Sequence, residues 1–260
     1  MFTVEKLLRP NSTKEAYDTL VSKKNNIVLG GCAFLRLSSR NISTAIDLSK
    51  LELDYIKDQK DYIEVGAYTT FRDIEIHPLF IENFNGVISK AVGNVIGIQF
   101  RNIVTIGASI FSKYGFSDLI TALLALDTEV ELYQAGRMSL EEFLKRPYEK
   151  DLLTRVFIKK DQRKAVYQDL RNSASDFPIL NVAVSRLDNQ WKIVVGARPQ
   201  KAAIAVKASR KISNTLNVED LEYCANIAAE ELNFGTNTRA TAKYRQEICK
   251  VLVKRAIKGV

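Results

Sequence analysis

The spacing of apolar residues in the first fifty positions predicts two short strands and a helix. Apolar runs at 27–29 and 45–48 have the length and the β-branched content of strands. Residues 12–24 carry the signature of a helix, in which Ser12 or Thr13 is the cap and Glu15 completes a capping box. These elements predict a small βαβ-like unit.

Both apolar periods, two and 3.6 residues, occur in the next hundred positions. Expected strands cover 62–67, 104–109, 128–132 and 152–158. Helical spacing covers 81–92, and the apolar run 119–126 is a helix that Ser117 caps. Together these elements predict a second unit of mixed α+β structure.

A polar stretch at 159–164 marks a domain boundary. After it, the alternating runs 179–186 and 190–197 flank a three-residue turn, which is typical of a hairpin. The expected final helices cover about 202–209, 218–232 and 238–257. We therefore expect an α+β protein with a two-part N-terminal domain over 1–160 and a C-terminal domain of antiparallel sheet and helices over 161–260.

The composition is that of a globular protein with a sizeable core. The chain has 260 residues, of which 46% are hydrophobic, so it does not need disulfides or metals to fold. It contains no run of about eighteen apolar residues, and its first residues lack the apolar stretch of a signal peptide. We expect a soluble, cytoplasmic protein without a membrane partner.

Metal and nucleic-acid sites are not indicated. Cys32, Cys224, Cys249 and the single His77 are too scattered for a zinc site, and an iron–sulfur cluster needs four thiolates. Any metal chemistry must therefore belong to another polypeptide. The net charge of +8 includes basic residues at helical spacing in 239–258, which we interpret as the solvated face of a surface helix rather than a nucleic-acid patch.

Two glycine-containing segments are candidates for phosphate binding. Gly30 and Gly31 follow the first apolar run, and Gly107 follows the run at 104–106. Backbone N–H groups at such bends can face a phosphate, and Asp118 at a helix start can hold a sugar hydroxyl. The spacing does not fit G-x-G-x-x-G, so a Rossmann site is disfavoured. Each segment alone is ordinary, but the pair predicts a dinucleotide site.

Several stretches of the chain resemble the FAD-binding medium subunit of the molybdenum hydroxylases, a family that includes xanthine dehydrogenases and carbon monoxide dehydrogenases. They cover 28–37, 98–110, 117–130, 152–156, 242–245 and 251–256. The resemblance implies a PCMH-type FAD-binding domain in an oxidoreductase subunit of a hetero-oligomer. In such complexes the flavin takes electrons from an iron–sulfur subunit and passes them to NAD⁺ or another acceptor, while a molybdopterin-binding large subunit oxidises the organic substrate.

The resemblance also implies which residues bind FAD. The two glycine segments hold the diphosphate, Asp118 contacts the cofactor and Leu152 lies near the flavin ring, with no catalytic side chain and no metal. These positions are Leu29, Gly30, Gly31, Cys32, Ala33, Phe34, Thr105, Ile106, Gly107, Ala108, Ser109, Asp118 and Leu152.

The sequence departs from the family pattern at four of these positions. Cys32 and Ala33 stand where polar residues are common, Ala108 replaces the second glycine and Ser109 replaces asparagine. A lost hydrogen bond costs about 0.5 to 1.5 kcal/mol, so we expect a lowered affinity for FAD.

Two other functional classes stay open. The first is a stand-alone reductase of related FAD fold, such as the enolpyruvyl sugar-nucleotide reductases, although the C-terminal third offers no convincing proton donor. The second is a binding or assembly protein that has lost its flavin, or a basic nucleic-acid binder. A flavin spectrum distinguishes the enzymes from the second class.

Overall fold

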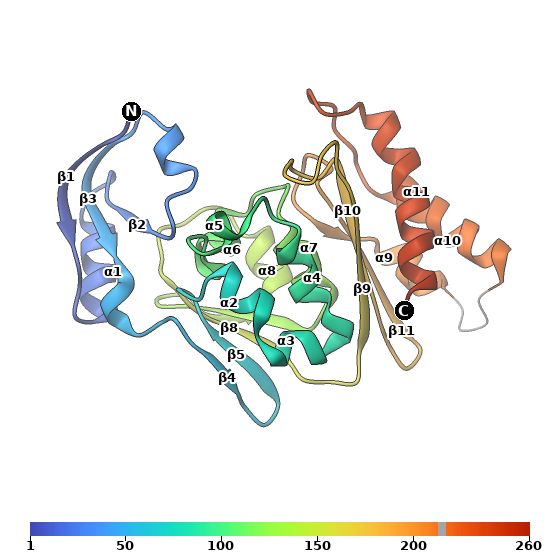
Figure 1. Cartoon of the computed structure of the whole chain (residues 1–260), viewed down its shortest axis with the longest axis horizontal. Coiled ribbons are helices and arrows are strands. Elements are labelled where there is room, and N and C mark those ends of the chain that lie inside the picture. Colours follow the sequence, from blue (N-terminus) through green and yellow to red (C-terminus); the bar gives the residue numbers. More distant parts are fainter. Residues whose placement is uncertain (213–216) are drawn as a thin grey trace. The chain divides into compact units, whose positions relative to one another are not determined.

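The computed structural model describes residues 1–212 and 217–260, which form two compact units (Figure 1). The first unit comprises 1–73, 98–112 and 128–158, and the second comprises 74–97, 113–127 and 159–260. The predicted α+β class is confirmed. These units interleave along the sequence, whereas the predicted domain division at residue 160 is contiguous, and that division stays a prediction.

The first unit begins with a three-stranded parallel sheet in the order β1-β3-β2. Its elements are β1 (Thr3–Leu8), α1 (Thr13–Ser22), β2 (Ile27–Leu29), η1 (Leu35–Leu37), β3 (Asn41–Asp47) and η2 (Leu48–Leu51). Helix α1 begins as predicted, because the Ser12 side chain accepts a hydrogen bond from the Glu15 N–H at 3.1 Å. The sequence pattern missed β1, since its residues are almost all exposed and do not alternate.

A five-stranded sheet in the order β4-β5-β8-β6-β7 forms the rest of the first unit. The elements are β4 (Ile56–Asp58), β5 (Tyr62–Gly66), α5 (Ile98–Arg101), α6 (Ile106–Ser112), β6 (Thr128–Leu132), β7 (Gly136–Ser139), α8 (Leu140–Lys145) and β8 (Leu153–Lys159). The predicted strand at 104–109 is wrong. Thr105 makes one strand-like bridge to Thr70, and α6 then begins because the Thr105 side chain accepts the Ala108 N–H.

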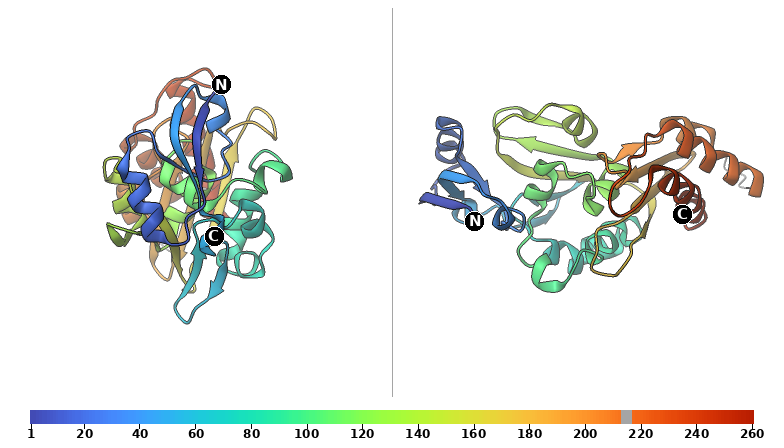
Figure 2. Two further views of the ribbon diagram at one scale, coloured as in Figure 1. Left: turned by 90° about the vertical axis from the view of Figure 1, so that its left-hand side faces the viewer. Right: turned by 90° about the horizontal axis from the view of Figure 1, so that it is seen from above.

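The second unit is built on an antiparallel sheet in the order β12-β11-β10-β9. Leu187 pairs with Gln190, which confirms the predicted hairpin. Figure 2 shows α10 and α11 side by side, and both contribute to the core that covers β10 and β11. The elements are α3 (Pro78–Glu82), η3 (Phe84–Gly86), α4 (Val87–Gly93), α7 (Asp118–Ala125), β9 (Lys164–Leu170), β10 (Leu180–Leu187), β11 (Gln190–Gly196), β12 (Ala203–Ile204), α9 (Val206–Lys211), α10 (Val218–Glu231) and α11 (Ala242–Lys258).

One further helix, α2 (Phe71–Ile76), contains the sequence boundary between the two units, which lies after Asp73. None of the helices in the described part of the chain has the length and apolar character that a membrane span requires.

Lys150 caps the C-terminus of α1 from a distant part of the sequence. Its ammonium group donates hydrogen bonds to three backbone carbonyls, those of Leu20 at 3.0 Å, Lys23 at 2.6 Å and Asn26 at 3.3 Å. The last carbonyls of a helix have no partner within the helix, and a cation at this end also complements the helix dipole. Lys150 therefore fixes the chain between α1 and β2, directly before the first glycine segment.

We expect Lys150→Met to lower the free energy of unfolding by about 1 kcal/mol, because three carbonyls lose a charged donor at a partly exposed site. Urea unfolding of the full chain measures this. Lys145→Met is the matched control, since Lys145 only pairs with Glu141 on the exposed face of α8. That control should cost less than about 0.5 kcal/mol. Equal losses in the two variants would contradict the capping role.

Candidate functional site

The first glycine segment is a turn whose backbone amides are not used by the fold. Gly31 and Cys32 follow β2 in the left-handed region, with φ of +78° and +57°. Within the described residues, the N–H groups of Gly31, Cys32 and Ala33 donate to no backbone carbonyl. All three residues are partly exposed. Consecutive free amides in such a turn form a concave anion-binding nest.

In the second glycine segment, backbone amides are hydrogen-bonded within the protein. The Gly107 N–H donates to the Ala67 carbonyl at 2.9 Å, and the Ile106 N–H donates to the Thr69 carbonyl at 2.9 Å. A Cβ added at Gly107 would lie 2.7 Å from both the Cβ and the carbonyl oxygen of Ala67. The glycine therefore allows α6 to pack closely on the loop after β5. These two amides are already satisfied within the protein.

The two glycine segments lie directly against each other in the first unit. A Cβ added at Gly30 would lie 3.1 Å from the Thr105 hydroxyl and closer still to the Cβ of Ala108. A Cβ added at Gly31 would lie 2.6 Å from the carbonyl carbon of Ile103. Both glycines are needed for this close approach of two backbones. The first segment thus presents its free amides on a surface that the second segment supports.

The alanine that departs from the family pattern fits its place. Ala108 lies within α6 and is not among the described residues with positive φ, so its Cβ causes no backbone strain. Its methyl group packs against Gly30. Ser109 is also part of α6, and its N–H donates to the Thr105 carbonyl at 3.1 Å. The second segment therefore accommodates both substitutions without a distorted backbone.

The thiol of Cys32 has the character of a neutral group. Burial raises the pKa of Cys32, and the nearby negative charge of Asp47 raises it further, although a backbone hydrogen bond at Gly30 acts in the opposite direction. Reactive cysteines have lowered pKa values and positive surroundings. Cys32 is therefore a small packing residue of the turn, and it is a free cysteine, as are Cys224 and Cys249.

A hydrogen-bonded pair that the sequence did not reveal stands beside the first segment. Asp47 ends β3 and pairs in register with Leu29, the last residue of β2. Its Oδ1 accepts a hydrogen bond from the Tyr68 hydroxyl at 3.0 Å, and its Oδ2 accepts one from Arg9 Nε at 3.0 Å. The position of an acid at the carboxyl end of a parallel strand next to the glycine turn was the available signal.

Hydrogen bonds from three residues determine the ionisation state of Asp47. Burial alone would raise the pKa of Asp47, but hydrogen bonds from Ser49, Tyr68 and Arg9 outweigh it and lower that pKa. Burial and the hydrogen bond to Asp47 raise the pKa of Tyr68 well above its ordinary value. At neutral pH the pair is therefore a phenol that donates to a carboxylate.

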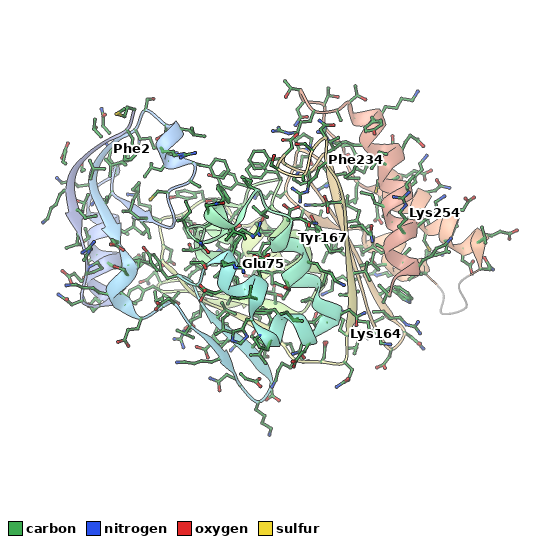
Figure 3. The ribbon with its side chains drawn as sticks, in the orientation of Figure 1. Phe2, Glu75, Lys164, Tyr167, Phe234 and Lys254 are labelled. Atoms are coloured by element: carbon green, nitrogen blue, oxygen red, sulfur yellow. The ribbon has the colours of Figure 1, made fainter. Side chains whose placement is uncertain are left out.

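Asp118 belongs to the second unit, where it is buried at the start of α7. Ser117 caps the helix by accepting the Ile120 N–H at 3.2 Å. Asp118 Oδ1 accepts hydrogen bonds from Arg171 at 2.7 Å, from Asn181 at 3.0 Å and from the hydroxyl of Tyr167 on β9. Of these residues, Tyr167 is labelled in Figure 3. All three donors converge on Oδ1, and in the described chain no donor to Oδ2 is found.

The charge of Asp118 is balanced by one arginine. Asp118 is 5% exposed, and the Arg171 side chain is 8% exposed. Burial raises the pKa of Asp118, while the charge of Arg171 and the hydrogen bonds from Tyr167, Arg171 and Asn181 act against that shift. The sequence identified the acid but not these partners, which come from β9, β10 and the loop between them.

The remaining predicted positions have different surroundings. Leu152 is buried in a small core cluster with Ala16, Leu20, Ile46 and Leu48, so its side chain is a packing residue in this structure. Leu29 is the last residue of β2, and Phe34 precedes η1, and both are partly exposed. Within the described residues, no group of three or more His, Cys, Asp or Glu side chains is arranged to hold a metal ion.

Comparison with protein families gives matches over almost the whole chain. A family model described as the FAD binding domain in molybdopterin dehydrogenase matches residues 2–160. A second, described as the CO dehydrogenase flavoprotein C-terminal domain, matches residues 165–260.

Individual proteins are similar at lower levels of identity. The glyceraldehyde dehydrogenase medium chain of Sulfolobus acidocaldarius is 26% identical over 273 residues, which cover 97% of this chain and 97% of that protein. The nicotinate dehydrogenase FAD-subunit of Eubacterium barkeri is 39% identical over 88 residues, which cover 34% of this chain and 29% of that protein.

The fold is shared with solved structures. A chain of the reconstituted CO dehydrogenase from Oligotropha carboxidovorans superimposes with a TM-score of 0.89 at 18% identity, covering 98% of this chain and 96% of that chain. At this identity the likeness concerns the fold alone.

Proposed function

Because this chain belongs to the family of FAD-binding subunits of molybdopterin dehydrogenases, we propose that it is the electron-transfer subunit of a molybdenum hydroxylase. The chain is an FAD-binding oxidoreductase subunit. In the proposed complex, electrons come from iron–sulfur clusters on a partner subunit and leave to NAD⁺ or another acceptor. A molybdopterin-binding large subunit carries out the oxidation of the organic substrate.

The observation that carries this proposal is the extent of the match to a medium chain. The chain covers 97% of the glyceraldehyde dehydrogenase medium chain, and the two family models leave few residues outside them. Three cysteines cannot provide the four thiolates of an iron–sulfur cluster. This supports a division of labour in which the other redox centres lie on partner chains. We propose residues 1–160 as the flavin domain and 161–260 as the C-terminal domain.

The diphosphate of FAD is proposed to bind at the first glycine segment. The free N–H groups of Gly31, Cys32 and Ala33 offer three donors to its oxygens, a pattern that fits an anion. Residues 105–109 are proposed to support this surface from behind through the contact of Gly30 with Ala108. Leu29 and Phe34, at the two ends of the turn, complete the proposed set.

Asp118 and Leu152 have different proposed roles. The Oδ2 atom of Asp118 is proposed as an acceptor for a hydroxyl of the cofactor, since Oδ1 is occupied by Tyr167, Arg171 and Asn181. Leu152 is proposed to act through packing, because its side chain lies in the same core cluster as Ile46 of β3. Bound FAD supplies the hydride and electron transfer, and this chain supplies orientation and electrostatics.

Isolation of the full complex tests the proposal. We expect a tagged chain, expressed in its natural host, to retain about one FAD and to co-purify with an iron–sulfur protein and a molybdopterin protein. Addition of NAD⁺ to the substrate-reduced complex then reports whether the flavin absorbance recovers. An FAD-loaded chain without partners would favour a stand-alone reductase, and a chain without flavin would favour an assembly role.

A further inference from the structure

We propose that the hydrogen bond between Tyr68 and Asp47, here called the Tyr68–Asp47 bridge, sets the spacing between the two glycine segments. Both residues are then positioning residues for the diphosphate of FAD. This inference rests on the FAD-binding role of the chain and does not depend on which partner subunits it has.

The Asp47 end of the bridge is tied to the first glycine segment. In the parallel pairing of β2 with β3, Asp47 lies opposite Leu29, and Gly30 and Gly31 follow directly. The Asp47 carboxylate is held in place by Arg9 Nε at 3.0 Å and by the Ser49 N–H at 3.0 Å. A displacement of Asp47 therefore moves the end of β2 and the free amides of the turn.

The Tyr68 end of the bridge is tied to the second glycine segment. Tyr68 stands between Ala67 and Thr69, whose carbonyls accept the N–H groups of Gly107 and Ile106. The backbone of this loop is also anchored in the sheet, because the Ala67 N–H donates to the carbonyl of Thr154 on β8 at 3.0 Å. A displacement of Tyr68 therefore moves the start of α6.

Steric contacts also join the two segments, and packing of this kind has no preferred direction. Gly30 packs on Ala108, and the cluster around Ile46 and Leu152 includes Tyr68 and Val28 at its margin. A hydrogen bond from a hydroxyl to a carboxylate is directional, and its length varies by only a few tenths of an ångström. The bridge therefore adds a defined distance to a contact that packing alone would leave adjustable.

Accurate spacing matters because a diphosphate is bound by several donors at once. A misplacement of about 1 Å in a binding group can cost about 100-fold in function. Loss of one bridge hydroxyl permits a smaller shift, and we expect a loss of about tenfold in FAD affinity from a hydrogen bond to a charged group. The alternative is that Tyr68 and Asp47 only stabilise the first unit. The experiment below distinguishes a role in positioning FAD from a role in stability alone.

The chain contains a matched control for this experiment. The Tyr55 hydroxyl donates to Glu64 Oε1 at 2.7 Å in the same unit, so it is also a phenol paired with a carboxylate. Tyr55 and Glu64 belong to the β4–β5 hairpin region, and neither is bonded to a glycine segment. Tyr55→Phe removes a hydroxyl of the same kind without touching the Tyr68–Asp47 bridge.

The experiment measures three quantities on the full chain: FAD affinity, ADP affinity by competition with FAD, and the thermal midpoint of the flavin-free protein. We expect Tyr68→Phe and Asp47→Asn each to lower the affinity for FAD and for ADP by about the same factor of ten. Tyr55→Phe should shift the thermal midpoint by as much as Tyr68→Phe and leave both affinities unchanged. In the double variant the loss should be smaller than the product of the two single losses, because both changes act on the Tyr68–Asp47 bridge, while Asp47→Asn also weakens the contact with Arg9.

Three results would overturn the inference. Unchanged FAD affinity in Tyr68→Phe, with wild type binding FAD, rejects the bridge alone and leaves the proposed function intact. An equal loss of affinity in Tyr55→Phe assigns the effect to general stability and also rejects it. A wild-type chain that binds neither FAD nor ADP rejects the diphosphate site together with the bridge.

Discussion

The Gly31→Ala variant is expected to bind FAD with an affinity about 100-fold lower than that of the wild type. Gly31 has a φ of +78°, and an added Cβ would lie 2.6 Å from the Ile103 carbonyl carbon and closer still to its oxygen. Backbone atoms cannot give way as a flexible side chain can, so the turn must move away from the second glycine segment. That movement displaces the free amides of Cys32 and Ala33. Fluorescence quenching of FAD titrated into the flavin-free chain measures the loss.

Gly136→Ala is the control that separates the clash from the backbone strain. Gly136 is the first residue of β7, directly after the β6–β7 turn, with a φ of +72°, and an added Cβ would meet no atom within 4 Å. It imposes the same left-handed strain of about 1 kcal/mol without displacing a neighbour. We expect unchanged FAD affinity in this variant. Full flavin retention in Gly31→Ala would show that the diphosphate does not bind at this turn.

The Arg171→Met variant should have the largest effect on stability, a loss of about 3 to 5 kcal/mol in the free energy of unfolding. Arg171 is the cation that balances the buried carboxylate of Asp118, and it also bonds Asp169 at 2.6 Å and the Asp176 carbonyl at 2.8 Å. Removal of one member of a buried pair leaves the other charged and desolvated. Urea unfolding, monitored by the single Trp191 of the second unit, measures the change.

Arg239→Met provides the comparison for Arg171→Met. Arg239 pairs with Asp176 at 3.1 Å, but its side chain is 33% exposed, so solvent screens the interaction. We expect a loss of at most about 1 kcal/mol. Similar losses in the two arginine variants would mean that Arg171 does not neutralise Asp118. If Asp118 also binds the cofactor, as proposed, Arg171→Met should in addition weaken FAD binding.

Local sequence patterns were sufficient to predict strands with a clear apolar pattern and helices that begin at a recognisable capping residue. The strand β2, the helix start at Ser117 and the β10–β11 hairpin all fall where the pattern predicts them. The prediction of a strand at residues 104–109 was wrong, because it relied on the β-branched residues in this stretch. The cap at Thr105 and the packing of Gly107 on Ala67 both favour a helix. The cap is a local signal, whereas the packing depends on a residue that is far away in the sequence.

The candidate site could be predicted in outline but not in its polar detail. Glycine pairs after strands are visible in a sequence because few other residues fit such turns. Tyr68 and Asp47 are separated by 21 positions, and Arg171 lies 53 positions from Asp118, so their pairing depends on the sheets that bring them together. In the same arrangement, the N–H groups of Gly31 and Ala33 donate to no backbone carbonyl of the described residues, whereas those of Ile106 and Gly107 are hydrogen-bonded within the protein.

The position of β8 has a consequence for biogenesis. This strand is the middle member of the order β4-β5-β8-β6-β7, yet it comes last among those five along the chain. A ribosome must therefore release residues 153–159 before the sheet can close, and such non-local pairing is slow to form. Nascent chains that stall before this point will expose unpaired strand edges to chaperones.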